Sequence, residues 1–278
     1  MSPKYLIVNA DDYNTNPERD RGIIQAAQEG IVTSVSVIAN MPSADDVLSD
    51  LQKTMGTRIG IHLNLTRGMP LERGVRTLVN QSGCFFDKQI AWRKAFLGVF
   101  DLREVEEEFA KQISLLKEMG ITPDHIDGNN HIHVFPGIAQ VVARLANQFG
   151  ISRIRLPLES FSKFGQYFQS PVLKKYFIGT LSRRALPVFK QHSLVFTDHF
   201  AGIQFPVVSR VESVTSFIES LPDGTTELMC HPGYRSLTDS PFSSAQREQE
   251  LFSLTHPAVL ESVERFNISL ISYSEMWS

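Results

Sequence analysis

Short runs rich in β-branched residues alternate with amphipathic helical patterns along nearly the whole chain, and this alternation most limits the possible folds. The expected strands cover residues 5–10, 31–39, 58–65, 121–127, 151–159, 193–200, 226–230 and 268–273. Strands that alternate with helices favour a parallel sheet covered by helices. Because no linker or break in composition divides the chain, the sequence predicts a single-domain distorted (β/α) barrel over residues 1–278.

Capping and stop signals bound the expected helices. Asn16 is a suitable N-cap for a helix that starts at Pro17, and Gly30 is a suitable stop. The expected helices cover residues 17–30, 43–51, 101–120, 138–150, 172–184, 209–221 and 245–266, with Ser43 and Asp101 as further caps. Residues 67–100 are glycine-rich and are expected to form a long irregular loop of the kind that often binds ligands.

Composition narrows the functional classes. Of the 278 residues, 42% are hydrophobic and 21% are charged, with a net charge of −3. No basic footprint for nucleic acid is present, and no apolar run reaches the roughly 18 residues of a transmembrane helix. We expect no signal peptide ahead of the first strand and no disulfide framework from Cys84 and Cys230. We therefore expect a cytoplasmic protein with no nucleic-acid or membrane partner.

Polar side chains stand at the ends of several expected strands. Asp11 and Asp12 follow the first strand, His62 lies near the end of the third, and His231 follows the strand at 226–230. Residues 129–133 (NNHIH) follow another strand. The carboxyl ends of the strands form the face that carries the active site in β/α barrels. The convergence of these residues on one face indicates an enzyme.

The carboxylates of Asp11 and Asp12, at the end of an apolar strand, need a nearby cation. This could be a metal ion, an arginine or a protonated histidine. Taken singly, an Asp-Asp pair is more often a cap, His62 a core histidine and His231 a turn residue. His131 and His133 would present both rings on one face of an extended segment. Together these residues make a carboxylate and imidazole set that suits zinc or a harder divalent ion, and hence hydrolysis of an amide or ester.

The sequence resembles the YdjC-like carbohydrate deacetylases, of the chito-oligosaccharide deacetylase type. The matching stretches are residues 8–13 (VNADDY), 30–34 (GIVTS), 60–65 (GIHLNL), 127–136 (DGNNHIHVFP) and 229–234 (MCHPGY). The resemblance implies a barrel similar to those of polysaccharide deacetylases. It also implies removal of acetyl groups from N-acetylated sugars with a divalent metal, Mg²⁺ or Zn²⁺.

The resemblance also implies roles for individual residues. Asp11 would be the base that activates water, Asp12 and His62 would bind the metal, and His231 would be the acid that protonates the departing amine. The family commonly has a histidine ligand where this chain has Asn129. Either His131 takes over as ligand, or Asn129 ligates weakly, or the site has lost its metal.

Three further residues are candidates for substrate binding: Arg155, His133 and Tyr234. Arg155 could instead orient the base or form a structural ion pair, and the ring of Tyr234 could stack on a sugar. Because of Asn129, a catalytically impaired sugar-binding or scaffold protein on the same barrel is the alternative function. A glycoside hydrolase would need a second acid facing Asp11 and would not depend on metal. A homodimer is possible.

Overall fold

The computed structural model describes residues 3–41, 47–159, 172–203, 208–237 and 239–276. The strands are β1 (Lys4–Tyr13), β2 (Ser34–Val37), β3 (Ile59–Leu63), β4 (Ile126–Gly128), β5 (His199–Ala201), β6 (Gly224–Cys230) and β7 (Ser269–Leu270). The α-helices are α1 (Pro17–Glu29), α2 (Val47–Met55), α3 (Lys88–Phe96), α4 (Leu102–Glu118), α5 (Ile138–Phe149), α6 (Val172–Gln191), α7 (Val211–Glu219), α8 (Pro241–Leu254) and α9 (Pro257–Arg265). Two 3₁₀ segments are η1 (Asn129–Val134) and η2 (Tyr273–Glu275).

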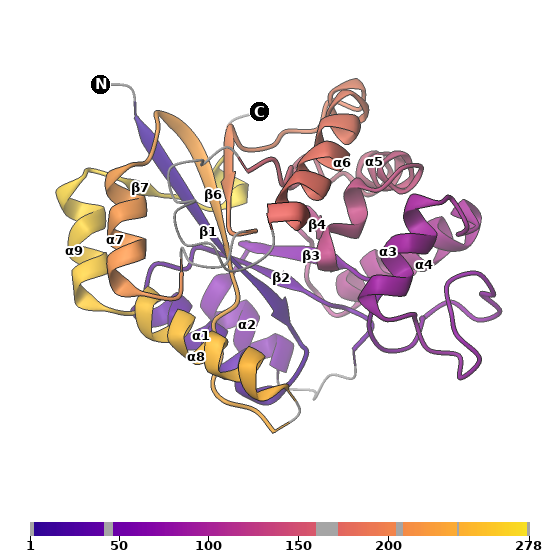
Figure 1. The fold of residues 1–278 in the computed structure, drawn as a ribbon, viewed down its shortest axis with the longest axis horizontal. Helices are drawn as coiled ribbons and strands as arrows, with labels where there is room; N and C mark the ends of the chain where they lie inside the picture. Colours follow the sequence, from indigo (N-terminus) through magenta and orange to yellow (C-terminus); the bar gives the residue numbers. More distant parts are fainter. Residues whose placement is uncertain (1–2, 42–46, 160–171, 204–207, 238, 277–278) are drawn as a thin grey trace.

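The sheet is parallel, in the order β4-β3-β2-β1-β6-β5, with β7 paired to the start of β1. Beyond the edge strands β4 and β5, isolated parallel bridges extend the sheet. Ile154 pairs with Ile126 of β4, and Glu159 pairs with Phe200 of β5. Helices surround the curled sheet, with α7, α8 and α9 on one side and α3 to α6 on the other (Figure 1). The predicted distorted (β/α) barrel is confirmed.

Several predicted elements differ in extent from the observed ones. Residues 151–159 form isolated bridges in place of a regular strand, and the irregular stretch 67–100 contains α3. The predicted helix over 245–266 is two helices, because Pro257 cannot donate a backbone hydrogen bond and disfavours helical conformation in the residue before it. The predicted cap Ser43 lies outside the described residues, and α2 begins at Val47.

The first predicted helix is confirmed. The side chain of Asn16 accepts a hydrogen bond from the backbone of Arg19, and α1 starts at Pro17. This capping satisfies a backbone donor that the first turn of a helix otherwise leaves free. The cap fixes α1 immediately after the Asp11-Asp12 pair, and this brings Arg19 next to the end of β1.

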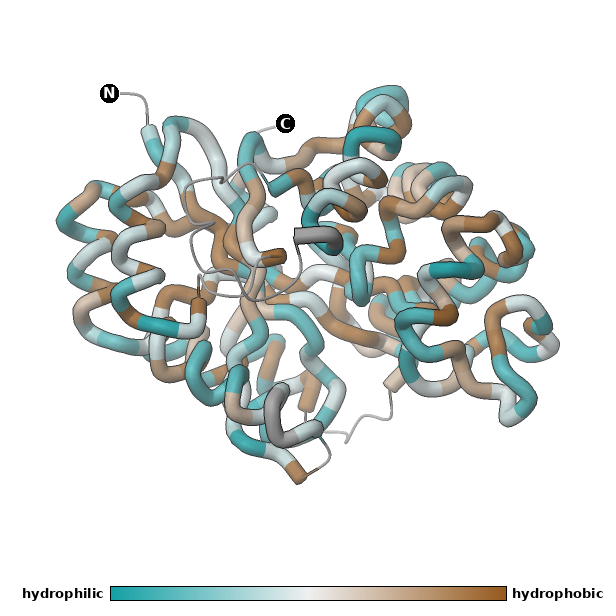
Figure 2. The backbone as a smooth tube through the Cα atoms, viewed as in Figure 1, coloured by the Kyte–Doolittle hydropathy of each residue, from teal (hydrophilic) through white to brown (hydrophobic). Residues whose placement is uncertain are grey.

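Strand alternation separates the core from the barrel axis. In β1, Leu6, Val8 and Ala10 join the main hydrophobic core, while Asn9 and Asp11 hydrogen-bond to each other on the other face. Apolar segments gather along the central strands, and apolar and polar segments alternate along the helices around them (Figure 2). None of the described helices is long and apolar enough to cross a membrane.

The axis side is closely packed beneath the strand ends. A Cβ atom on Gly60 of β3 would lie 2.2 Å from the imidazole of His125, so this position accepts only glycine. Because Gly60 has no side chain, there is room for the His125 ring, which stacks on Tyr273 of η2 with ring centroids 3.9 Å apart. This packed layer supports the polar residues at the strand ends above it.

Candidate active site

A bulge at the end of β1 directs the side chains of two neighbouring aspartates to the same side of the strand. Ala10 pairs with Val35, but Tyr13 pairs with Val37, so β1 holds one extra residue there. Asp12 adopts the left-handed conformation, with φ of 73°. Successive side chains of a regular strand point to opposite faces. Here the bulge lets both Asp11 and Asp12 lie on the axis side.

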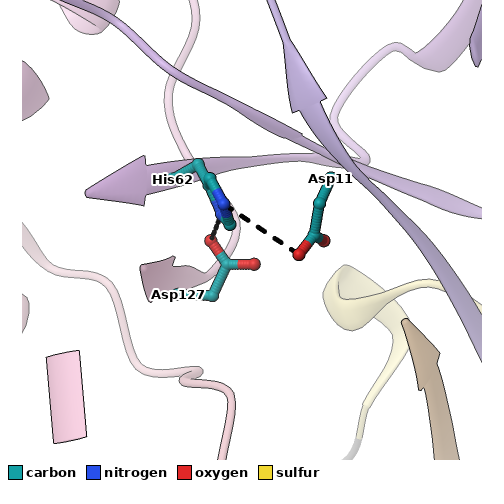
Figure 3. Close-up of side chains that lie close together, drawn as sticks. All are labelled: Asp11, His62 and Asp127. Atoms are coloured by element: carbon teal, nitrogen blue, oxygen red, sulfur yellow. Dashed lines mark hydrogen bonds and ion pairs between the residues drawn. The ribbon is translucent and has the colours of Figure 1, made fainter. Parts of the chain in front are cut away.

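His62 stands between these carboxylates and a third one. Its Nε2 lies 4.0 Å from Asp11 Oδ2 and 3.8 Å from Asp12 Oδ1. Its Nδ1 is 2.7 Å from an oxygen of Asp127, which pairs with His62 across β3 and β4 (Figure 3). Burial lowers the pKa of His62, but the carboxylates of Asp127 and Asp11 outweigh burial and raise it to about 9.

Arg155 joins three carboxylates beneath this site. Its guanidinium is fully buried and contacts both oxygens of Asp11 at 2.7 Å. It also contacts Asp127 at 2.8 Å and Glu227 at 2.7 Å. Glu227 in turn accepts a hydrogen bond of 2.5 Å from the hydroxyl of Tyr273. Because its donors are occupied and buried, this placement favours orientation of Asp11 over contact with a substrate.

Asp12 has a different set of partners. One oxygen, Oδ2, accepts from Arg247 at 2.6 Å and from Arg19 at 3.3 Å. Both arginines also pair with Asp239, so two arginines and two aspartates form a closed ring. Burial favours the neutral acid, but Arg247 and its neighbours hold the pKa of Asp12 well below its usual range. Asp12 is therefore ionised in the folded protein.

The second oxygen of Asp12 faces Asn129. Asn129 Nδ2 donates to Asp12 Oδ1 at 3.0 Å. The oxygen of Asn129 accepts from the hydroxyl of Thr66 at 2.6 Å and from Asn130 Nδ2 at 2.7 Å. The structure thus places Asn129 beside Asp12, with its amide nitrogen turned toward that carboxylate.

The expectation of an extended segment around His131 and His133 is wrong. η1 is a 3₁₀ segment in which Asn130 and His131 have positive φ angles. His133 Nε2 lies 3.0 Å from the carbonyl oxygen of Arg155, and His131 packs edge-on against Phe200. Because the local backbone turns, the two rings do not form a pair on one face. Among the described residues, the clustered candidate metal ligands are Asp11, His62 and Asp127, without His131.

His231 follows β6, as the sequence predicted, and its backbone donates to Glu250 at 2.5 Å. A Cβ on Gly22 of α1 would lie 2.4 Å from Gly233, so α1 packs directly on the turn that carries His231. Burial lowers the pKa of His231 to about 4, against the attraction of Asp11. The same burial raises the pKa of Glu250 to about 7.

Tyr234 is directed to the outer side of this turn. Its hydroxyl donates to Gln25 of α1, and the guanidinium of Arg21 lies 4.8 Å from the centre of its ring. These contacts place the ring against α1. The structure does not bring Tyr234 together with the Asp11, His62 and Asp127 group.

The residues present fit a divalent cation. A metal-binding histidine commonly donates its second ring nitrogen to a carboxylate, and His62 has this arrangement with Asp127. The other ring nitrogen faces Asp11 and Asp12. Carboxylate oxygens and one imidazole nitrogen suit Mg²⁺, Mn²⁺ or Zn²⁺. His62 and Asp12 would hold the ion, with Asp11 beside it.

Five contributors to this site were not foreseen: Arg19, Asp127, Glu227, Asp239 and Arg247. Arg247 lies in α8, over two hundred residues from Asp12, and no local spacing marks it. Arg19 is the exception, because it stands in the first turn of a helix that starts just after the aspartate pair. A carboxylate pair followed at once by a capped helix is a signal that could have indicated an arginine partner.

The fold and the site define a β/α-barrel protein with a buried carboxylate and histidine centre at its strand ends. A family model described as YdjC-like protein matches residues 5–265. The chain belongs to the YdjC-like family.

Relatives match over the whole length. Carbohydrate deacetylase of Mus musculus is 32% identical, over 98% of this chain and 94% of that protein. Carbohydrate deacetylase of Geobacillus stearothermophilus is also 32% identical, over 99% of each chain. The crystal structure of a putative cellobiose-phosphate cleavage protein from Enterococcus faecalis is similar, with a TM-score of 0.80 at 25% identity over 98% of each chain.

Proposed function

We propose that this protein is a hydrolase that removes acetyl groups from N-acetylated sugars or oligosaccharides with a divalent metal ion, Mg²⁺ or Zn²⁺. One observation carries the proposal: Asp11 and Asp12 converge on Nε2 of His62, and the other ring nitrogen, Nδ1, is hydrogen-bonded to Asp127. The full-length similarity to proteins named carbohydrate deacetylase supports the same substrate class.

Asp11 is the proposed base. In the reaction a water oxygen bonds to the acetyl carbon, the carbon–nitrogen bond breaks, and acetate and a free amine leave. Asp11 takes a proton from the water, and the two contacts with Arg155 fix the direction of its carboxylate. A bound divalent ion would supply polarisation of the acetyl carbonyl.

His231 is the proposed acid. With its pKa lowered to about 4, its ring is neutral at neutral pH. The amine nitrogen needs a proton as it leaves, so His231 must gain one during the reaction before it can pass one on. The proton that Asp11 removes from water is the available source, and this makes proton transfer between the two residues part of the proposed cycle.

The test is acetate release from N-acetylated chito-oligosaccharides by the purified protein, with added Mg²⁺ or Zn²⁺ and with chelator. We expect release that chelator abolishes. Sugar cleavage without metal would refute the proposal in favour of a glycoside hydrolase. Sugar binding without any acetate release would favour the impaired binding protein, for which the inward-turned nitrogen of Asn129 is the supporting observation.

We also propose a cytoplasmic location, which the two free cysteines, Cys84 and Cys230, support because disulfides are rare there. A homodimer stays a prediction that light scattering of the purified protein can test.

A further inference from the structure

Asn129 presents a donor, not a ligand atom, to the proposed metal site. Its Nδ2 lies 3.0 Å from Asp12 Oδ1. An ionised carboxylate only accepts hydrogen bonds, so the amide atom that faces it must be the nitrogen. Asp12 is ionised because Arg247 and Arg19 pair with its other oxygen. For Asn129 to become a ligand, its amide would have to turn over.

The surroundings of the Asn129 oxygen oppose this turn. That oxygen accepts from Thr66 and from Asn130, and Asn130 Nδ2 also donates to the Thr66 hydroxyl at 3.0 Å. We call these three residues the amide clamp. If Asn129 turned over, its nitrogen would face the nitrogen of Asn130 at a separation of 2.7 Å, and two donors would oppose each other.

The amide clamp is held in place from outside the site. Asn130 has φ of 54° and ψ of 25°, a left-handed conformation that asparagine tolerates. Its carbonyl accepts a hydrogen bond of 3.0 Å from the indole of Trp92 in α3. Trp92 packs on Phe135 and Phe177, with ring centroids 5.8 and 5.5 Å away. The Trp92 contact thus anchors the backbone of Asn130 and fixes where its side chain meets Asn129.

We propose that Asn129 holds Asp12 by donating a hydrogen bond to it and does not itself bind the metal. Among the described side chains, only Asp12 and His62 would then be ligands of the divalent ion. This inference rests on the proposed metal-dependent function and specifies its metal site. Water and substrate complete the coordination. Mg²⁺ commonly binds in this way, through few carboxylates and several waters, whereas Zn²⁺ sites usually have three or four protein ligands. The site is therefore one for a hydrated, oxygen-preferring cation.

The test is calorimetric titration of Mg²⁺ and Zn²⁺ into the wild-type protein, Asn129→Ala, Asn129→His and His62→Ala. We expect Asn129→Ala to bind Mg²⁺ about tenfold more weakly than the wild type, because it removes a hydrogen bond that holds the ligand Asp12 in place. Asn129→His should bind Zn²⁺ at least about tenfold more tightly, because it adds a third protein ligand. Unchanged Mg²⁺ affinity in Asn129→Ala would show that Asn129 does not hold Asp12, and would overturn the inference.

A second readout needs no variant at Asn129. With Mn²⁺ as the probe, electron paramagnetic resonance in ¹⁷O-labelled water counts the waters on the ion. Two protein ligands leave about four of six octahedral positions for water, and a third ligand from Asn129 leaves about three. A count of three would contradict the inference even if the protein releases acetate. No metal binding by any variant would overturn both the inference and the metal-dependent function.

Discussion

Arg155 should be the most costly single residue to replace in this site. It makes four contacts of 2.7–2.8 Å with Asp11, Asp127 and Glu227, and all of these side chains are almost fully buried. Removing one partner of a buried ion pair costs about 3–5 kcal/mol. Arg155→Met leaves three carboxylates without this cation, so we expect a loss of unfolding free energy of about 5 kcal/mol or more.

Arg155→Lys gives a graded comparison. Lysine keeps the charge but has three donors for four contacts, so at least one charged hydrogen bond is lost, at about 1.5–3 kcal/mol. The assay is urea unfolding followed by circular dichroism. Arg144→Met is the matched control, because its pair with Glu106 is on the surface and contributes at most about 1 kcal/mol. If Arg155→Met and Arg155→Lys cost no more than this control, the buried network does not stabilise the fold as argued.

Three other predictions concern the site and its edge. Asp11→Asn should abolish acetate release yet leave metal affinity nearly intact, and loss of the metal in calorimetry would overturn its role as base. His62→Ala should lose metal affinity, so unchanged affinity would remove it from the ligands. Burial raises the pKa of Asp20 to about 7, so its ionisation in the folded state costs stability as pH rises from about 4 to 7. The unfolding free energy of Asp20→Asn, relative to that of the wild type, should therefore be about 3 kcal/mol higher at pH 8 than at pH 5. Urea unfolding at both pH values measures this. A difference between variant and wild type that is the same at both pH values would contradict the prediction.

Two helix starts that were predicted from local capping signals agree with the structure. Asn16 and Pro17 set the start of α1, and the three-to-four spacing after Asp101 set α4. Predictions of strand length were less accurate, because a strand ends where its partner stops pairing, and the partner is distant in sequence. Residues 151–159 show this, since their neighbours β4 and β5 are only three residues long.

The same distinction applies to the site. Strand ends predicted that Asp11, His62 and His231 lie on one face, because parallel strands bring their carboxyl ends together. The direction of the Asn129 amide could not be predicted, since it depends on Thr66 and Asn130 together. The positive φ angles in η1, which separate His131 from His133, likewise follow from contacts that the local sequence does not reveal.

The two adjacent aspartates have the same chemistry but different surroundings, and this difference supports the roles proposed for them. Asp12 receives two arginines on one oxygen and stays ionised, which suits its proposed role as a metal ligand. Asp11 pairs with Arg155, which it shares with two more carboxylates and which fixes the direction of its own carboxylate. The bulge in β1 therefore matters as much as the residues themselves, because it gives each carboxylate its own neighbours.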